Sequence, residues 1–163
     1  MRWGAPSLRF PSNVSSTGYT VSDSSAPLIR VVAAVIERGR QVLVALRPPD
    51  KRHGGMWEFP TGKVEGAESD VDALRRELAE ELGLRILSTA PPIAAFRDPG
   101  SPFLIVFVPV KTEGEPECRE HLALRWVDWI DWCELGLLPL APGDLRFVAG
   151  RAGLGKDGKA ALL

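Results

Sequence analysis

The feature that most constrains this chain is a short segment, residues 62–84, in which carboxylates gather on an expected helix. It reads GKVEGAESDVDALRRELAEELGL. At 3.6 residues per turn, the apolar side chains of such a helix form one stripe, which contains Val71, Leu74, Leu78 and Leu82. A neighbouring face carries three glutamates, Glu77, Glu80 and Glu81. The segment is therefore expected to bury one helix face and to cluster negative charge on another.

The ends of this helix are also marked in the sequence. Ser69 can cap the first turn, and the acidic side chains of Asp70 and Asp72 suit the positive end of the helix dipole. Gly83 can adopt the left-handed conformation that ends many helices. These signals predict a helix over residues 69–82.

The acidic face has two interpretations. Carboxylates one turn apart repel each other, which slightly destabilises an isolated helix. A hard divalent cation would reverse that penalty, because Mg²⁺ prefers oxygen ligands and also binds substrate phosphates. The alternative is a solvated acidic surface, which is common on helices.

The loop before the helix favours the metal interpretation. Gly62 and Gly66 allow the backbone to approach a ligand closely, and Lys63 offers a cation to a phosphate. Glu68 can pair with Arg76 and hold the loop against the helix. Carboxylates beside such a loop indicate metal-assisted hydrolysis of a phosphoanhydride.

The remaining sequence predicts more strands than helices. Strands are expected at 28–36, 41–46, 57–59, within 85–96, at 103–111 and at 122–127. Short helices are expected at 129–135, after an N-cap at Asp128, and at 142–149. The fold class is therefore α/β or α+β around a mixed sheet. Residues 28–163 are expected to form one domain, and residues 1–27, rich in Ser and Pro, a disordered extension.

Composition excludes several classes of protein. With 20 basic and 21 acidic residues, the chain lacks the basic excess typical of proteins that bind nucleic-acid polymers. No apolar run reaches the roughly 18 residues that suggest a membrane-spanning helix. Cys118 and Cys133 have no metal-ligand spacing, and a reduced, cytoplasmic location is expected.

Residues 62–84 resemble the Nudix box, G-x5-E-x7-R-E-U-x-E-E-x-G-U, in which U is aliphatic. All its specified positions are filled: Gly62, Glu68, Arg76, Glu77, Leu78, Glu80, Glu81, Gly83 and Leu84. The run 57–65 is similar to W-E-F-P-G-G-K-x-E of the MutT-type branch, with Thr61 in place of a glycine. Residues 120–126 and 138–144 resemble two further stretches of that branch. The resemblance covers roughly residues 28–149.

The resemblance implies a Nudix α/β/α sandwich and Mg²⁺- or Mn²⁺-dependent hydrolysis of a nucleotide. It assigns the cation to the Thr61 carbonyl and to four glutamates, Glu77, Glu80, Glu81 and Glu120. By the same resemblance Glu68 and Arg76 position the loop and helix, Arg47 and Lys63 meet the nucleotide and its phosphates, and Asp144 reads a base edge. The implied reaction converts a nucleoside triphosphate, such as the oxidised 8-oxo-dGTP, to the monophosphate and pyrophosphate, for sanitation of the nucleotide pool. The enzyme is expected to be a monomer or homodimer.

Several alternatives remain open from the sequence. The substrate can be another nucleoside diphosphate derivative, such as a nucleotide sugar, a dinucleotide or coenzyme A. A Nudix-fold binding module without catalysis is a further possibility. His53 is expected in a solvated loop, and His121 at a strand edge. Trp57, Trp126, Trp129 and Trp132 are expected to pack on the core or sheet edge rather than stack on a base.

Overall fold

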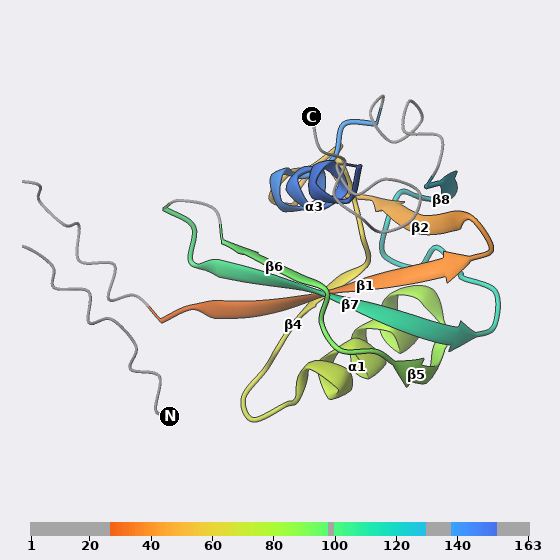
Figure 1. The fold of residues 1–163 in the computed structure, drawn as a ribbon, viewed down its shortest axis with the longest axis horizontal. Helices are drawn as coiled ribbons and strands as arrows, with labels where there is room; N and C mark the ends of the chain where they lie inside the picture. Colours follow the sequence, from red (N-terminus) through yellow and green to blue (C-terminus); the bar gives the residue numbers. More distant parts are fainter. Residues whose placement is uncertain (1–26, 98–99, 130–137, 153–163) are drawn as a thin grey trace, which may run out of the picture.

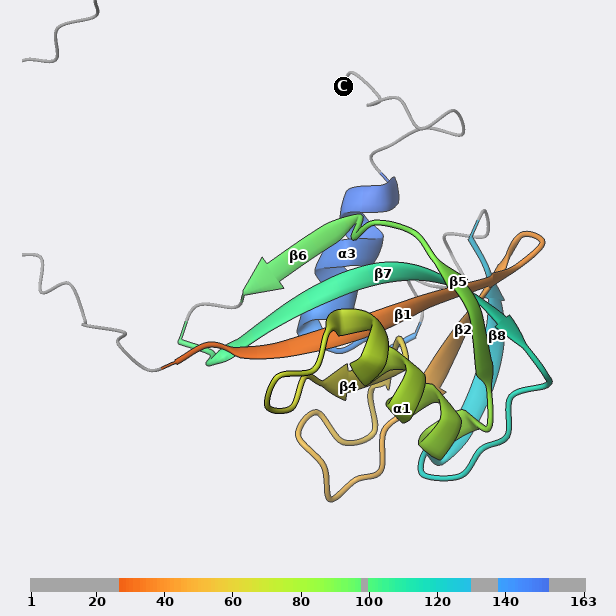
Figure 2. The ribbon, with the colours of Figure 1, turned by 90° about the horizontal axis from the view of Figure 1, so that it is seen from below.

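The protein folds as a mixed β-sheet between two helices in the computed structural model, which describes residues 27–97, 100–129 and 138–152 (Figure 1). Its strands are β1 (Ile29–Arg38), β2 (Gln41–Leu46), β3 (Trp57–Glu58), β4 (Thr61–Lys63), β5 (Arg85–Thr89), β6 (Ala94–Arg97), β7 (Phe103–Glu113) and β8 (Ala123–Asp128). The helices α1 (Asp70–Leu82) and α3 (Pro142–Ala152) lie on opposite sides of the sheet (Figure 2). The expected α/β fold around a mixed sheet is confirmed.

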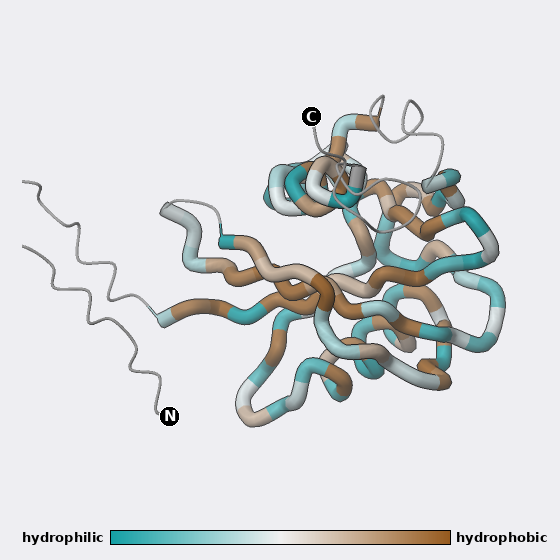
Figure 3. Tube along the Cα trace, in the orientation of Figure 1, coloured by the Kyte–Doolittle hydropathy of each residue, from teal (hydrophilic) through white to brown (hydrophobic). Residues whose placement is uncertain are grey.

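β1 and β7 form the centre of the sheet because both are long and apolar. They pair in parallel from Ile29 opposite Phe103 to Ile36 opposite Val110, and they run side by side in Figure 1. Successive side chains of a strand point to opposite faces. The even-numbered β1 residues 32–36 therefore belong to the α1-side core, and residues 33 and 35 to the α3-side core. Because a helix covers each face of the sheet, side chains on both faces of β1 and β7 are apolar, and both strands are coloured mostly as hydrophobic in Figure 3.

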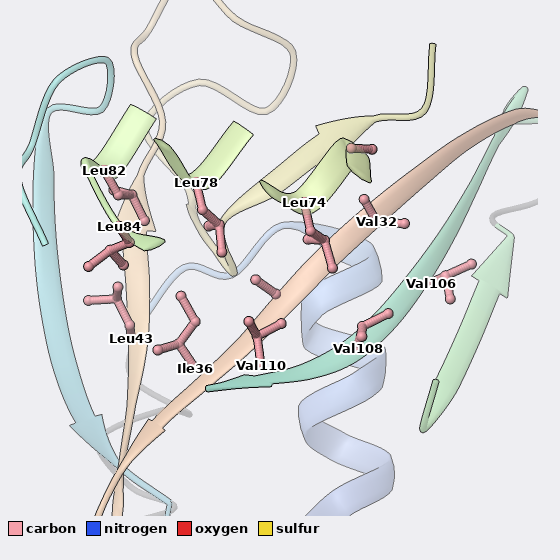
Figure 4. Close-up of a cluster of buried hydrophobic side chains, with 12 residues drawn as sticks. Val32, Ile36, Leu43, Leu74, Leu78, Leu82, Leu84, Val106, Val108 and Val110 are labelled. Carbon is pink, nitrogen blue, oxygen red and sulfur yellow. The ribbon is translucent and has the colours of Figure 1, made fainter. Parts of the chain in front are cut away.

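The predicted apolar stripe of α1 packs on one face of the sheet. Leu74, Leu78 and Leu82 have at most 1% of their surface exposed. Figure 4 shows them above Ile36, Val108 and Val110 of the sheet. Truncating one such leucine to alanine typically costs about 2–5 kcal/mol. This packing fixes which face of α1 remains available for its glutamates.

Aromatic side chains fill the core on the other face of the sheet. Phe59 meets Phe107 and Phe147 edge to face, with ring centroids 5.7 and 5.3 Å apart. Phe107 stacks on Phe147 of α3 at 4.2 Å. Trp57 and Trp129 pack against this cluster, as the sequence analysis expected. Phe59 lies between β3 and β4, so its burial anchors the chain that leads into the segment with the glutamates.

β1 and β2 form a short hairpin. The two strands pair only at Glu37 with Val42 and at Arg38 with Gln41. β2 instead pairs along its length with β8, while β1 continues beside β4 and β7. The single strand expected within residues 85–96 is two strands, β5 and β6, with Pro91 and Pro92 between them, since proline has no N–H for a ladder.

Several expectations lie outside the described residues. These are the disordered extension, except its last residue, most of the helix at 129–135, and the positions of Trp132 and Cys133. Asp128, the expected N-cap, is the last residue of β8, and its carboxylate accepts a hydrogen bond of 2.8 Å from Arg40. Neither described helix has the length and apolar character needed to cross a membrane.

Candidate active site

The helix with the glutamates begins and ends where the sequence predicts. Ser69 Oγ accepts a hydrogen bond of 3.2 Å from the backbone N–H of Asp72. Gly83 ends the helix with φ of 65°, in the left-handed region, and its N–H bonds to the Ala79 carbonyl. These caps place Glu77 and Glu81 within the last two turns of α1.

The loop before α1 is held by a hydrogen-bond network centred on Arg76. Arg76 Nε and Nη2 donate to the two carboxylate oxygens of Glu68 at 2.8 and 2.9 Å. Arg76 also donates to the Lys63 carbonyl and to Glu77, at 3.0 and 2.8 Å. The hydrogen bonds from Arg76, helped by the backbone N–H of Glu65, lower the pKa of Glu68 to about 2. The predicted contact between Glu68 and Arg76 therefore forms.

Gly62 permits a close approach between β4 and α1. A Cβ at this position would collide with Cγ of Glu77. Residue 62 is buried, and Thr61 and Lys63 on either side of it line the same cavity as Glu77. The missing side chain thus allows the Glu77 side chain to lie directly against the β4 backbone.

A cavity of about 440 Å³ opens where α1, β4, the loop after β2 and the first turn of α3 meet. Charged and histidine side chains line much of it: Arg47, Lys51, Arg52, His53, Glu58, Lys63, Glu65, Glu77, Glu81, Glu120, His121 and Asp144. Most of the site residues predicted from the sequence are therefore brought together. Glu68, Arg76 and Glu80 are the exceptions, and none of them lines the cavity. The Glu80 side chain is 58% exposed and lies 3.9 Å from Arg76.

Glu81 has the properties expected of a cation ligand. Burial raises its pKa to about 7, and the negative charges of Glu77 and Glu120 act in the same direction, whereas His121 opposes them. Its Oε2 atom is buried and has no hydrogen-bond partner among the described residues. A buried carboxylate oxygen without a donor, beside other carboxylates, fits a hard divalent cation. Within the described ranges, no three acidic, histidine or cysteine side chains are already arranged around one point, so a cation would have to draw them together.

The cavity also contains a buried chain of charged groups that the sequence analysis missed. Arg47 Nη1 donates to both oxygens of Glu58 at 2.6 and 2.5 Å. Nε2 of His121 lies 3.3 Å from Glu58, and the His121 side chain is only 6% exposed. Burial lowers the pKa of His121, but the hydrogen bond to Glu58 and the charge of Glu81 outweigh it, so the pKa is raised. His121, expected at a strand edge, lies just before β8, and its side chain is buried against Glu58 because β3 and β8 both pair with β2.

Asp144 occupies a different environment, in the first turn of α3. Its side chain is buried, and Oδ1 accepts a hydrogen bond of 2.9 Å from the backbone N–H of Phe59. Burial raises the pKa of this carboxyl to about 8, and the charge of Glu58 adds to the rise, while the Phe59 N–H opposes it. Asp144 is therefore protonated near neutral pH, and it offers a cavity ligand both a donor and an acceptor.

Cations line the cavity beside the ring of Phe103. The Arg52 guanidinium lies 5.2 Å from the ring centroid, and the Lys63 ammonium lies 5.7 Å from it. Arg47 Nε donates to the Arg52 carbonyl at 2.6 Å and thereby fixes the loop from residue 47 to residue 52. His53, expected in a solvated loop, is half-buried and lines the cavity. The arrangement places several positive groups where a polyphosphate can be bound.

The amino-acid sequence of this chain is similar to those of several known proteins. The family described as NUDIX domain matches residues 27–150. The chain is 38% identical to the CTP pyrophosphohydrolase of Escherichia coli (strain K12), over 72% of this chain and 87% of the relative. It is 42% identical to a Mycobacterium tuberculosis (strain H37Rv) protein provisionally named 8-oxo-dGTP diphosphatase 2, over 73% of this chain and 84% of that protein.

Solved structures show the same fold. The solution structure of the Escherichia coli ORF135 protein superposes with a TM-score of 0.67 and 35% identity, covering 82% of this chain and 94% of that one. A MutT structure, from work on Aliivibrio salmonicida and Vibrio cholerae, gives a TM-score of 0.63 and 29% identity, covering 75% and 94% of the two chains.

Proposed function

The chain belongs to the Nudix family of hydrolases that act on phosphoanhydride bonds, and we propose that it converts a nucleoside triphosphate to the monophosphate and pyrophosphate with Mg²⁺ or Mn²⁺. Nudix hydrolases act on nucleotide substrates and generally use divalent cations. A substrate with an oxidised or otherwise non-standard base, such as 8-oxo-dGTP, fits best.

One observation carries the proposal: carboxylates and cations line the same cavity. Glu77, Glu81 and Glu120 provide the oxygen donors that a hard cation prefers. We assign the Thr61 carbonyl and Glu80 to the same cation, Glu80 entering from the rim of α1. When bound, the cation supplies Lewis-acid stabilisation of the charge that develops on phosphate oxygens.

The chain's own cations would hold the polyphosphate. Arg47 and Lys63 line the cavity, and Lys51 and Arg52 add positive charge on the loop after β2. Arg47 is preorganised, because its Nε and Nη1 atoms are already bound to the Arg52 carbonyl and to Glu58. Its orientation therefore costs little entropy when a phosphate binds. Arg76 stays outside the cavity lining and keeps the loop and Glu77 in place.

The protonated Asp144 supports a preference for certain bases. Guanine presents two acceptors, N7 and O6, on its major-groove edge, and a neutral carboxyl cannot donate to both. Oxidation at C8 turns N7 into an N–H donor next to the O6 acceptor, which matches the donor and acceptor of a neutral carboxyl. The amino group and N3 of cytosine match it as well. The cytosine alternative is favoured by the 38% identical CTP pyrophosphohydrolase.

A substrate panel tests the proposal. Canonical triphosphates, 8-oxo-dGTP, nucleotide sugars, dinucleotides and coenzyme A are incubated with Mg²⁺ or Mn²⁺, and products are separated by chromatography. We expect the monophosphate and pyrophosphate from 8-oxo-dGTP or CTP, with a higher kcat/KM than for dGTP. Faster cleavage of nucleotide sugars or dinucleotides would refute the triphosphate assignment.

A variant of Asp144 then tests the origin of base preference. Asn at this position keeps an acceptor for the Phe59 N–H and also offers a permanent N–H donor. Asp144→Asn should therefore retain discrimination against dGTP, whereas Asp144→Leu should lose it. As a matched control, Asp50→Asn in the exposed turn after β2 should leave the ratio unchanged. Equal substrate ratios in wild type and Asp144→Leu would contradict base reading by Asp144.

A further inference from the structure

We propose that Arg119 is a positioning residue that docks the loop of residues 114–121 on the C-terminal end of α1 and thereby holds Glu120 at the cavity. The proposal rests on the proposed catalytic role of Glu120. Arg119 itself does not line the cavity, whereas Glu120 and His121 do. Arg119 therefore acts through the position of the loop and not by touching the substrate.

Three hydrogen bonds join the loop to the last turn of α1. The backbone N–H of Glu117 donates to the Leu82 carbonyl at 2.8 Å, and that of Arg119 donates to the Glu81 carbonyl at 3.2 Å. The Arg119 side chain adds a third bond, from Nη1 to the Ala79 carbonyl at 2.9 Å. All three acceptors are carbonyls of the last turn of α1, where carbonyls run out of partners further along the helix; the Ala79 carbonyl also accepts the N–H of Gly83.

The charge of the guanidinium suits this place on α1. The C-terminal end of a helix carries partial negative charge, and cations there are stabilising. The last turn of α1 contains no basic residue of its own. Arg119 therefore supplies from the loop the positive charge that the helix lacks, and Glu117 pairs with its Nε at 2.9 Å.

Gly83 leaves the space that the guanidinium occupies. A Cβ at residue 83 would lie 2.7 Å from Nη2 of Arg119 and 3.0 Å from Cζ. The glycine thus has two purposes, because its φ of 65° ends α1 and its missing side chain admits the arginine.

A second anchor lies on the other side of Glu120. His121 is buried against Glu58, and the backbone N–H of Leu122 donates to the Leu46 carbonyl at 2.9 Å. Glu120 is exposed, yet it sits between two fixed neighbours and lines the cavity. The contacts on both sides thus hold Glu120 at the cavity.

The test compares Arg119→Ala and Arg119→Lys with wild type, each also combined with Glu120→Gln. Amide hydrogen exchange of the peptide covering residues 113–121, without metal or nucleotide, reports docking directly. Turnover of 8-oxo-dGTP and CTP with Mg²⁺ gives kcat and KM. Arg85→Ala is the matched control. Arg85 is an exposed arginine on β5 that donates to Glu113 on β7, and among the described residues it shows no hydrogen bond to a carbonyl of α1.

We expect Arg119→Ala to increase exchange in this peptide and to lower kcat about tenfold, with KM changed less than twofold, as for a misplaced catalytic group. Lysine keeps the charge but lacks the planar guanidinium that reaches Glu117 and the Ala79 carbonyl from two separate nitrogens, so its effect should be intermediate. In the Glu120→Gln background the further loss should be less than twofold, because positioning matters only while Glu120 is active.

Unchanged exchange, or unchanged kcat in a variant whose exchange has risen, would overturn the positioning role and leave the proposed hydrolysis standing. An equal loss of kcat with and without Glu120 would show that Arg119 acts by another route. If wild type releases no pyrophosphate from any triphosphate, the proposed function fails. If instead Glu120→Gln turns over at the wild-type rate, only the positioning of a catalytic Glu120 is overturned.

Discussion

Replacing Asp144 with asparagine isolates the energetic effect of its buried carboxyl. Burial raises the pKa of Asp144 from its ordinary value of 3.8 to about 8, because the charged form is poorly solvated there. Between these two values the folded protein keeps the proton and the unfolded chain loses it. Stability should therefore be highest below about pH 4 and should fall as pH rises towards about 8. Asparagine has nearly the same shape and keeps an acceptor for the Phe59 N–H, but it cannot ionise.

The pKa values set the size of the effect. A pKa raised from 3.8 to about 8 corresponds to a loss of unfolding free energy of at most roughly 6 kcal/mol, at about 1.4 kcal/mol per pH unit. Relaxation and water penetration around the charged group reduce such penalties, so we expect about 2–4 kcal/mol. Glu68 changes the pH dependence in the opposite direction, since its pKa is lowered to about 2. Only the difference between wild type and Asp144→Asn isolates Asp144, because Glu68 is common to both.

Urea unfolding at pH 5, 7 and 9 measures this difference. Relative to Asp144→Asn, wild type should lose at least about 2 kcal/mol of unfolding free energy between pH 5 and pH 9. The control Asp50→Asn, in an exposed turn, should run parallel to wild type. Parallel curves for wild type and Asp144→Asn would refute the protonated Asp144 and with it the argument for base preference.

Three further predictions concern the carboxylates and the backbone beside them. Excess chelator should abolish pyrophosphate release, and adding Mg²⁺ back should restore it. Turnover that persists in excess chelator would show that hydrolysis needs no divalent cation. Glu81→Gln should lower kcat by about tenfold to hundredfold. Glu80→Gln should lower kcat by less, because the Glu80 side chain is 58% exposed and does not line the cavity. Steady-state kinetics that show a larger loss for Glu80→Gln would contradict the geometry. Gly62→Ala should lower the unfolding free energy by about 1–3 kcal/mol and should also lower turnover, since the new Cβ would collide with Glu77. Gly150→Ala, where a Cβ would meet no other atom, should change neither the stability nor the turnover. Thermal unfolding and steady-state kinetics of both variants measure the two effects.

Local features of the fold could be predicted from the sequence, whereas long-range pairings could not. The caps at Ser69 and Gly83 and the buried leucine stripe of α1 depend on neighbours within a few turns, and all are confirmed. The contact between Glu58 and His121 joins residues 63 positions apart and exists only because β3 and β8 both pair with β2. Neither side chain shows a partner at a helical or hairpin spacing, so no local pattern could reveal the pair.

The same limit explains why α1 seemed to present three equivalent glutamates. Helical spacing places Glu77, Glu80 and Glu81 on one broad face. Which part of that face meets a cavity depends on elements that approach from elsewhere, here β4 beside Glu77 and the docked loop beside Glu81. The Glu80 side chain does not line the cavity and is 58% exposed.

Glu58 links the two halves of the proposed site. Burial is the main reason that the pKa values of Glu81 and Asp144 are raised, and the negative charge of Glu58 adds to both. Its carboxylate also binds Arg47 and His121. Removing Glu58 would therefore free the arginine, loosen the loop beside Glu120 and lower both pKa values at once. Loss of activity in a Glu58 variant would be compatible with every role proposed for this cavity. Asp144→Asn and Arg119→Ala are more informative, because the first changes the buried carboxyl alone and the second the docking of the loop alone.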